Sequence, residues 1–173
     1  KPIILVLMNG RPLDLTIGDS LADAILEVWY PGTSGGLGVA DILFGKYNPS
    51  AKLPITFPRN LGQVPIYYNQ KNTGRPISKE NPTEDYKSNY IDSPNTPLYP
   101  FGHGLSYTTF KYSEIKLSND KVKESEILKA SSTITNSGDY DGHEVVQLYI
   151  RDKVGSITRP VKELKGFKKI FLK

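Results

Sequence analysis

The first 58 residues carry continuous apolar runs that end at glycine and proline turns. Residues 3–8 (IILVLM) form such a run, closed by Asn9-Gly10, and this pattern is typical of a strand covered on both faces. Residues 10–23 have about the length of a crossover that returns the chain to a parallel neighbour. Residues 24–30 (AILEVWY) predict a second buried strand, which would be this parallel neighbour. A helical face within them is the alternative, although Pro31-Gly32 would end such a helix early.

Two shorter patterns follow this predicted strand pair. Residues 37–45 (LGVADILFG) predict a short helix, with Gly45 just past its end. Residues 52–58 (KLPITFP) predict a third short strand, which the prolines limit to a sheet edge or a first position. The succession of strand, crossover, strand, helix and strand over residues 1–58 predicts part of an α/β sheet.

After Thr109 the hydrophobic period becomes two, and turns rich in Asn, Gly and Asp separate the segments. Val146, Leu148 and Ile150, for example, fall on one face of a strand. Four segments predict short antiparallel strands in this way: 110–118, 127–136, 143–152 and 161–172. Residues 110–173 therefore predict an all-β, immunoglobulin-like sandwich.

The residues between these two parts follow no period. Residues 59–97 mix prolines, asparagines, charges and tyrosines, and that many aromatic side chains argues against disorder. The stretch 97–110 (PLYPFGHGLSYTTF) is rigid and aromatic, so it could be a site, a core element or a strap between domains. We predict three regions: residues 1–58, a tyrosine-rich connecting strap at 59–109, and the sandwich at 110–173.

The net charge of +4 lies entirely in the last third of the chain. Residues 111–173 hold 13 Lys/Arg and 9 Asp/Glu, whereas residues 1–110 hold 9 of each. The lysines Lys162, Lys165, Lys168 and Lys169 sit among acids at strand-like spacing, which favours a solvated face over a nucleic-acid site. No apolar run approaches a membrane span, and the chain has no cysteine. We therefore expect no nucleic-acid partner and no membrane partner.

One short motif has the form of a nucleophile elbow. Residues 32–36 (GTSGG) fit G-x-S-x-G and lie between a predicted strand and a predicted helix. Asp85 or Asp92, followed by His103, would complete the order Ser34, acid, His. Glycine-rich matches are common, however, and His103 stands between two glycines, so a structural turn is the favoured interpretation.

The chain offers few groups for a metal or a sugar. His103 and His143 are its two histidines, and the DYDG stretch at 139–142 reads as a hairpin turn rather than a calcium loop. A solvated face is the favoured reading of three carboxylates near the predicted crossover, Asp14, Asp19 and Asp23. Trp29 could stack on a sugar, but core packing is favoured. We expect no metal site and no cofactor.

Both ends of the chain fall inside patterned segments. The apolar strand at residues 3–8 and the strand ending near Phe171 have no polar tail beside them. We therefore expect the chain to be a piece of a larger protein, with the last sandwich truncated at its C-terminus.

Several stretches together resemble a known family. They occur in order along almost the whole chain: residues 1–13 (KPIILVLMNGRPL), 24–59 (AILEVWYPGTSGGLGVADILFGKYNPSAKLPITFPR), 61–76 (LGQVPIYYNQKNTGRP), 98–110 (LYPFGHGLSYTTF) and 159–172 (RPVKELKGFKKIFL). The sequence resembles the C-terminal part of glycoside hydrolase family 3, most closely bacterial β-glucosidases. One departure is Ser34, where relatives often carry Glu.

The resemblance implies a fold and an activity. It implies that residues 1–58 are the last strands and helix of an α/β/α sandwich and that residues 110–173 are a fibronectin type III-like sandwich. It also implies retaining hydrolysis of terminal β-D-glucosyl residues, with the Asp nucleophile and the Glu acid/base upstream of Lys1, so that no catalytic residue is assigned in this chain. The substrate, a β-glucoside or oligosaccharide, would bind through upstream domains. A homo-oligomer and a periplasmic or extracellular location are further expectations.

Three functions remain open at this point. The favoured one is a non-catalytic segment of a β-glucosidase, expected to be inactive by itself. A stand-alone carbohydrate-binding or adhesion module is the second, and titration with soluble sugars would reveal it. A serine hydrolase using Ser34 is the third, and Ser34→Ala with an ester substrate would test it.

Overall fold

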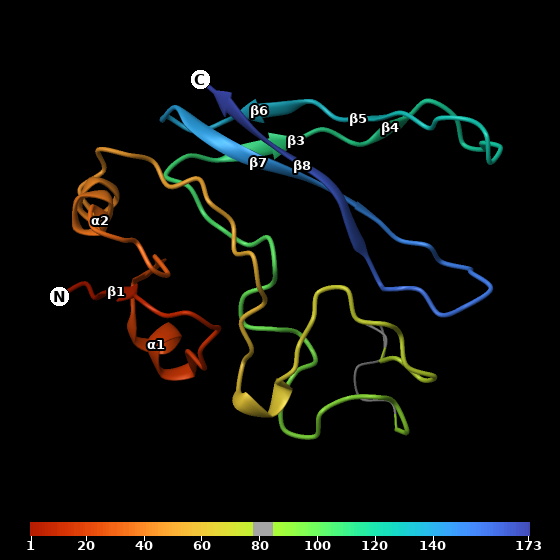
Figure 1. Cartoon of the computed structure of the whole chain (residues 1–173), viewed down its shortest axis with the longest axis horizontal. Helices are drawn as coiled ribbons and strands as arrows, with labels where there is room; N and C mark the ends of the chain where they lie inside the picture. The colour runs from red at the N-terminus through yellow and green to blue at the C-terminus, as the bar shows by residue number, and fades with distance from the viewer. Residues whose placement is uncertain (78–84) are drawn as a thin grey trace.

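The computed structural model describes residues 1–77 and 85–173, and most of its regular structure is strand. In Figure 1 the N-terminal elements lie apart from the C-terminal strands, and long loops run between them. The α-helices among the described residues are α1 (Thr16–Leu21) and α2 (Gly35–Leu43). The strands are β1 (Ile4–Leu7), β2 (Ala24–Glu27), β3 (Phe110–Tyr112), β4 (Lys116–Leu117), β5 (Ala130–Ser131), β6 (Ile134–Asn136), β7 (Gly142–Ile150) and β8 (Glu163–Leu172), and a 3-10 turn spans Leu61–Gln63.

Strands β1 and β2 pair in parallel, as the crossover length predicted, with Leu7 opposite Glu27. The crossover contains α1, a helix that the sequence pattern did not predict. Strand β2 ends at Glu27 rather than at residue 30, because Trp29 has a φ of 51°, outside the extended region. In this chain the first strand is not covered on both faces, since Ile4 is 50% exposed.

The predicted helix is shifted by two residues, and the predicted third strand is not formed. Helix α2 begins at Gly35, two residues before the predicted start at 37, and Gly45 follows it with a φ of +73°. Residues 52–58 form no regular strand, so that prediction is wrong. Pro54 and Pro58 have no N–H group to donate to a ladder. Leu53 and Phe57 nevertheless donate backbone hydrogen bonds to residues 103 and 99 of the strap.

The strands after residue 109 are antiparallel, as predicted, and pair as β3–β6, β4–β5 and β7–β8. The predicted strand at 110–118 is split into β3 and β4, and between them the Ser113 hydroxyl accepts a hydrogen bond from the backbone N–H of Thr133 (2.9 Å). The residues 139–142 do not form the predicted hairpin turn, because they join β6 to β7 and these strands pair with other partners. No described helix is long and apolar enough to cross a membrane.

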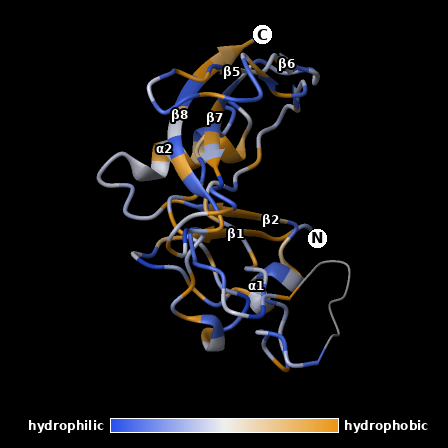
Figure 2. Cartoon of the chain, turned by 90° about the vertical axis from the view of Figure 1, so that its right-hand side faces the viewer, coloured by the Kyte–Doolittle hydropathy of each residue, from blue (hydrophilic) through white to orange (hydrophobic). Residues whose placement is uncertain are grey.

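The apolar core lies beside β1 and β2, which Figure 2 shows as largely hydrophobic strands. Leu7, Leu15 and Phe57 are its buried members. Trp29 packs against this cluster, with its ring centroid 6.0 Å from that of Phe57, so core packing is the confirmed role of this side chain. The core therefore joins the parallel strands to the segment that pairs with the strap.

Candidate functional site

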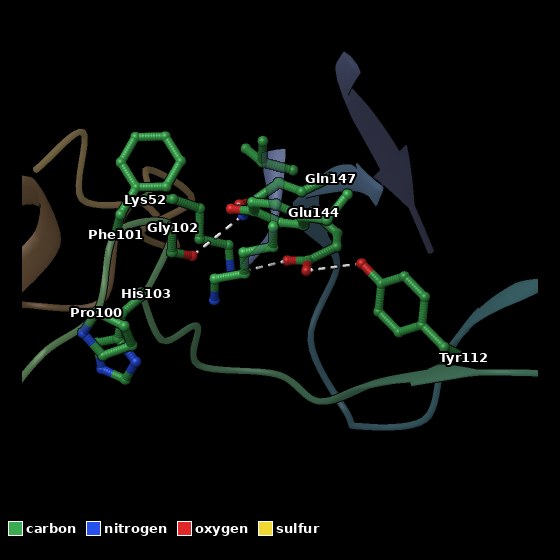
Figure 3. Close-up of a pocket in the computed structure, with 11 residues that line it drawn as sticks. Lys52, Pro100, Phe101, Gly102, His103, Tyr112, Glu144 and Gln147 are labelled. Atoms are coloured by element: carbon green, nitrogen blue, oxygen red, sulfur yellow. Dashed lines mark hydrogen bonds and ion pairs between the residues drawn. The ribbon is translucent and has the colours of Figure 1, made fainter. Parts of the chain in front are cut away.

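A row of contacts joins the β7–β8 hairpin to the rest of the chain, and we call this row the seam. On one side it contains Asn48, Lys52, Tyr68, Gln70, Phe101 and Gly102, and on the other Asp141, Glu144, Gln147, Tyr149, Val161 and Leu164. An open cavity of about 320 Å³ lies along it, and Figure 3 shows the side chains around this cavity.

An ion pair occupies the middle of the seam. Lys52 Nζ lies 3.1 Å from Glu144 Oε2, and the two side chains are only 16% and 11% exposed. The same Lys52 ammonium donates to the Gly104 carbonyl (2.7 Å). The hydroxyl of Tyr112 on β3 donates to Glu144 Oε1 (2.9 Å), so each carboxylate oxygen has its own partner (Figure 3). Burial, the hydrogen bond to Glu144 and the charge of Glu144 raise the pKa of Tyr112.

A glycine of the strap lies directly against β7. The Gln147 side-chain amide donates to the Gly102 carbonyl (3.1 Å), and the Tyr149 hydroxyl donates to Gln147 Oε1 (2.6 Å). Gly102 has a φ of +80°, and a Cβ atom there would lie 2.2 Å from Gln147 Oε1. Glycine is therefore required here both by the backbone conformation and by the close approach.

Aromatic rings hold the far end of the seam. Tyr68 stacks on Phe101 with centroids 4.2 Å apart and meets Tyr149 edge-on at 6.1 Å. The Tyr68 hydroxyl accepts a hydrogen bond from the Leu164 backbone N–H (3.4 Å), and the Val161 N–H donates to the Gln70 carbonyl (2.8 Å). The loop around residues 67–71 is thus attached to the turn between β7 and β8.

The side chains that line the cavity along the seam join segments of the chain, so they are poorly placed to bind a ligand. Lys52, Glu144 and Gln147 line it, and each of them already has protein partners. His103 also lines it, and its ring stacks on Tyr99 at 5.3 Å. Burial, followed by the nearby charge of Lys52, lowers the pKa of His103, which favours the neutral imidazole.

The residues of the predicted nucleophile elbow lie apart. Ser34 is exposed, immediately before α2, and lines a second, largely apolar cavity of about 450 Å³ with Val28 and Ile42. His103 lines the seam cavity instead, and Asp85 and Asp92 are exposed. His103 lies in no helix or strand, and its carbonyl accepts a hydrogen bond from the backbone N–H of Leu53 (2.7 Å).

The three carboxylates near the crossover have separate hydrogen-bonding roles. Asp14 accepts from the N–H and hydroxyl of Thr16, at 3.1 and 2.7 Å, and these bonds lower its pKa. Asp19 accepts from the Tyr99 hydroxyl, and Asp23 accepts from the Ile3 N–H (2.7 Å). Within residues 1–77 and 85–173, no group of three or more His, Cys, Asp or Glu could hold a metal ion.

The lysines at the end of the chain do not form one cluster. Lys162 lies over the Tyr149 ring, 5.4 Å from its centroid, and Lys165 lies 3.4 Å from Glu163. Lys168 and Lys169 are neighbours on β8, so their side chains point to opposite faces of the strand.

Comparison with known proteins identifies the family. Residues 1–107 match the glycosyl hydrolase family 3 C-terminal domain, and residues 144–173 match the fibronectin type III-like domain. The chain belongs to glycosyl hydrolase family 3 and contains its C-terminal domain.

The relatives are similar over the whole chain but are much longer. The periplasmic beta-glucosidase of Salmonella typhimurium is 56% identical over 173 residues, which are 100% of this chain and 22% of that protein. A beta-xylosidase of Formosa agariphila is 44% identical over 100% of this chain and 23% of its own length. The crystal structure of beta-glucosidase from Listeria innocua in complex with isofagomine has a TM-score of 0.95 and 47% identity, covering 99% of this chain and 24% of that one. The chain therefore spans about a fifth of the length of the relatives it matches.

The ion pair at the seam was not identified from the sequence. The sequence feature that could have indicated the ion pair is Glu144. This charged residue falls on the same face of the predicted strand as Val146 and Leu148. A charge on an apolar strand face requires a partner. No local pattern points to Lys52, which lies 92 positions earlier in the chain.

Proposed function

We propose that this chain is a non-catalytic C-terminal part of a β-glucosidase, and that the whole protein hydrolyses terminal β-D-glucosyl residues. The observation that carries the proposal is the match of the entire chain to about a fifth of proteins such as the Salmonella typhimurium periplasmic beta-glucosidase. The geometry supports it, because Asp14, Asp19 and Asp23 each hold a separate structural hydrogen bond.

The proposed reaction is a retaining hydrolysis. A carboxylate attacks the anomeric carbon, a second carboxyl group protonates the leaving oxygen, and water then resolves the glycosyl-enzyme intermediate. These two groups stand about 5–5.5 Å apart in retaining enzymes. We place both of them in the part of the protein that precedes Lys1, so no residue of this chain has a catalytic role.

The proposed domain organisation follows the same relationship. Residues 1–58 supply the last strands and helix of an α/β/α sandwich, of which the parallel pair β1–β2 is a part. Residues 110–173 belong to the fibronectin type III-like domain, and residues 59–109 connect the two. In support, the strap pairs with residues 53–57 and also contacts β7 through Gly102. A periplasmic or extracellular location agrees with the name of the Salmonella relative.

Hydrolysis of an aryl β-glucoside tests the proposal directly. The whole protein should release the aryl group, and this 173-residue chain alone should not. An aryl β-xyloside, run in parallel, determines whether the whole protein shares the substrate named for the Formosa agariphila relative. Turnover by this chain that survives Ser34→Ala would place the reactive carboxylates inside it and contradict the proposal. Turnover lost in Ser34→Ala would instead support a serine nucleophile.

A further inference from the structure

The contacts of the seam follow one another along residues 141–164, which include β7, the connection to β8 and the start of β8. Asn48 donates to the Asp141 carbonyl (3.0 Å), Lys52 pairs with Glu144, and the Gly102 carbonyl accepts from Gln147. Beyond the hairpin turn, the Val161 N–H donates to the Gln70 carbonyl (2.8 Å). A hairpin attached at so many points could still slide by two residues and present the same face, because strand side chains alternate with a period of two.

We propose that Lys52, Glu144 and Tyr112 form a docking key that determines where the β7–β8 hairpin lies along the seam. Through the hairpin, the key would also set the position of the loop at residues 67–71. Apolar contacts are non-directional and tolerate sliding, whereas a nearly buried ion pair does not. A two-residue slip would separate Glu144 from Lys52 and leave two nearly buried charges without their ionic partners, although the Gly104 carbonyl would still accept from Lys52.

The position of Tyr112 strengthens this role. Lys52 holds one oxygen of the Glu144 carboxylate and Tyr112 holds the other, so the carboxylate is fixed in orientation as well as in place. Lys52 lies in the N-terminal part of the chain, Tyr112 on β3 and Glu144 on β7, so the three side chains come from segments far apart in the sequence. The key therefore joins the β3–β6 pair and the β7–β8 pair to the N-terminal part at one point (Figure 3).

Hydrogen exchange in the whole protein tests the proposal at a distance from the substitution. The probe is a peptide that contains Val161, whose N–H bonds to Gln70 at the far end of the hairpin. The reference is a peptide that contains Val28, whose N–H bonds to Leu7 (3.0 Å). Lys52→Met removes the charge and keeps most of the side-chain length. We expect exchange at Val161 to become on the order of 100-fold faster, with Val28 unchanged.

The exposed pair on β8 supplies a matched control. Lys165 and Glu163 lie 3.4 Å apart with side chains 47% and 39% exposed, so Lys165→Met should change exchange at Val161 by less than about 3-fold. An equal effect of Lys165→Met and Lys52→Met would overturn the proposal, as would unchanged Val161 exchange in Lys52→Met.

A double variant separates docking from general stability. Lys52→Met with Glu144→Leu leaves no unpaired charge, and replacing a buried ion pair by apolar groups is often neutral for stability. We expect Val28 to remain protected in this variant, while Val161 still exchanges at least about 10-fold faster than in the unsubstituted protein. Full recovery at Val161 would show that the pair contributes only stability, and the docking role would be rejected. This variant decides the question even if Lys52→Met alone unfolds.

Discussion

The core around Phe57 and the seam around Glu144 are both shielded from water, but they are held together by different interactions. Phe57 is 1% exposed and its neighbours in the core are Leu7, Leu15 and Trp29, so its contacts are apolar. Glu144 is 8% exposed when its backbone is counted with its side chain, yet its partners are an ammonium group and a phenol. Two regions of similar burial thus have opposite chemistry.

The difference indicates a division of roles between the two regions. Apolar burial stabilises in proportion to the area removed from water and does not require one fixed geometry. Charged and hydrogen-bonded groups contribute less net stability, but they lose much when a partner is misplaced. We therefore expect substitutions in the core to act mainly on stability and substitutions in the seam to act mainly on how the two parts are joined.

The largest effect is expected in the core. Phe57→Ala should lower the free energy of unfolding by about 3–5 kcal/mol, because it removes a fully buried aromatic ring and leaves a cavity. Denaturant unfolding followed by circular dichroism measures this. Phe44→Ala is the matched control, since Phe44 is 88% exposed and its loss should change stability by no more than about 0.5 kcal/mol. Similar losses in both variants would show that the Phe57 contacts do not form the core.

A smaller loss is expected where the strap meets β7. Gly102→Ala should lower the free energy of unfolding by about 1–3 kcal/mol. The φ of +80° at this position strains an L-residue, and the new Cβ would collide with Gln147. Gly38→Ala is the control: nothing lies within 4 Å of a Cβ there, so alanine in α2 should stabilise the helix by roughly 0.5–1 kcal/mol. If Gly102→Ala behaves like Gly38→Ala in thermal unfolding, the strap does not lie against β7 as described.

The smallest effect is a pH dependence that links the strap to α1. Burial, followed by the hydrogen bond to Asp19 and the charge of Asp19, raises the pKa of Tyr99 to about 12. Because the folded pKa lies above the ordinary value, the contribution of Tyr99 is complete below pH 10 and is lost as the pH rises from about 10 to 12. Across this pH range, the free energy of unfolding of the unsubstituted protein should fall by on the order of 1 kcal/mol relative to that of Tyr99→Phe.

Denaturant unfolding at several pH values, together with the absorbance of ionised tyrosine, would measure this loss. Comparison with Tyr99→Phe cancels the titration of the lysines and of the other tyrosines. A stability difference between the two proteins that stays constant from pH 9 to pH 12 would contradict the bond between Tyr99 and Asp19.

Local patterns were enough to predict much of the fold. The apolar run at residues 3–8 and the crossover length indicated a parallel pair, and the alternation after Thr109 indicated antiparallel strands. The second signal is the two-residue period of a strand, whereas the first is a continuous apolar run followed by a connection of crossover length. The quoted stretches also carried the family, which the matches over residues 1–107 and 144–173 confirm.

The predictions that were wrong depended on partners distant in the sequence. Residues 52–58 read as a strand by themselves, but their backbone bonds go to the strap some 45 residues later. The first strand has the apolar pattern of a covered strand, but the pattern does not say that Ile4 is half exposed in this chain. Burial is a property of what lies against a segment, and a local pattern does not contain that information.

The sequence by itself determined the type of most elements, the packing of Trp29 in the core and the family to which the chain belongs. Only the tertiary structure decided that Lys52 and Glu144 are partners and that Gly102 must be a glycine. Hydrophobic periodicity is written within ten or so neighbouring residues, so it can be read locally. An ion pair between positions 92 residues apart exists only after the chain has folded and brought the two charges within 3.1 Å.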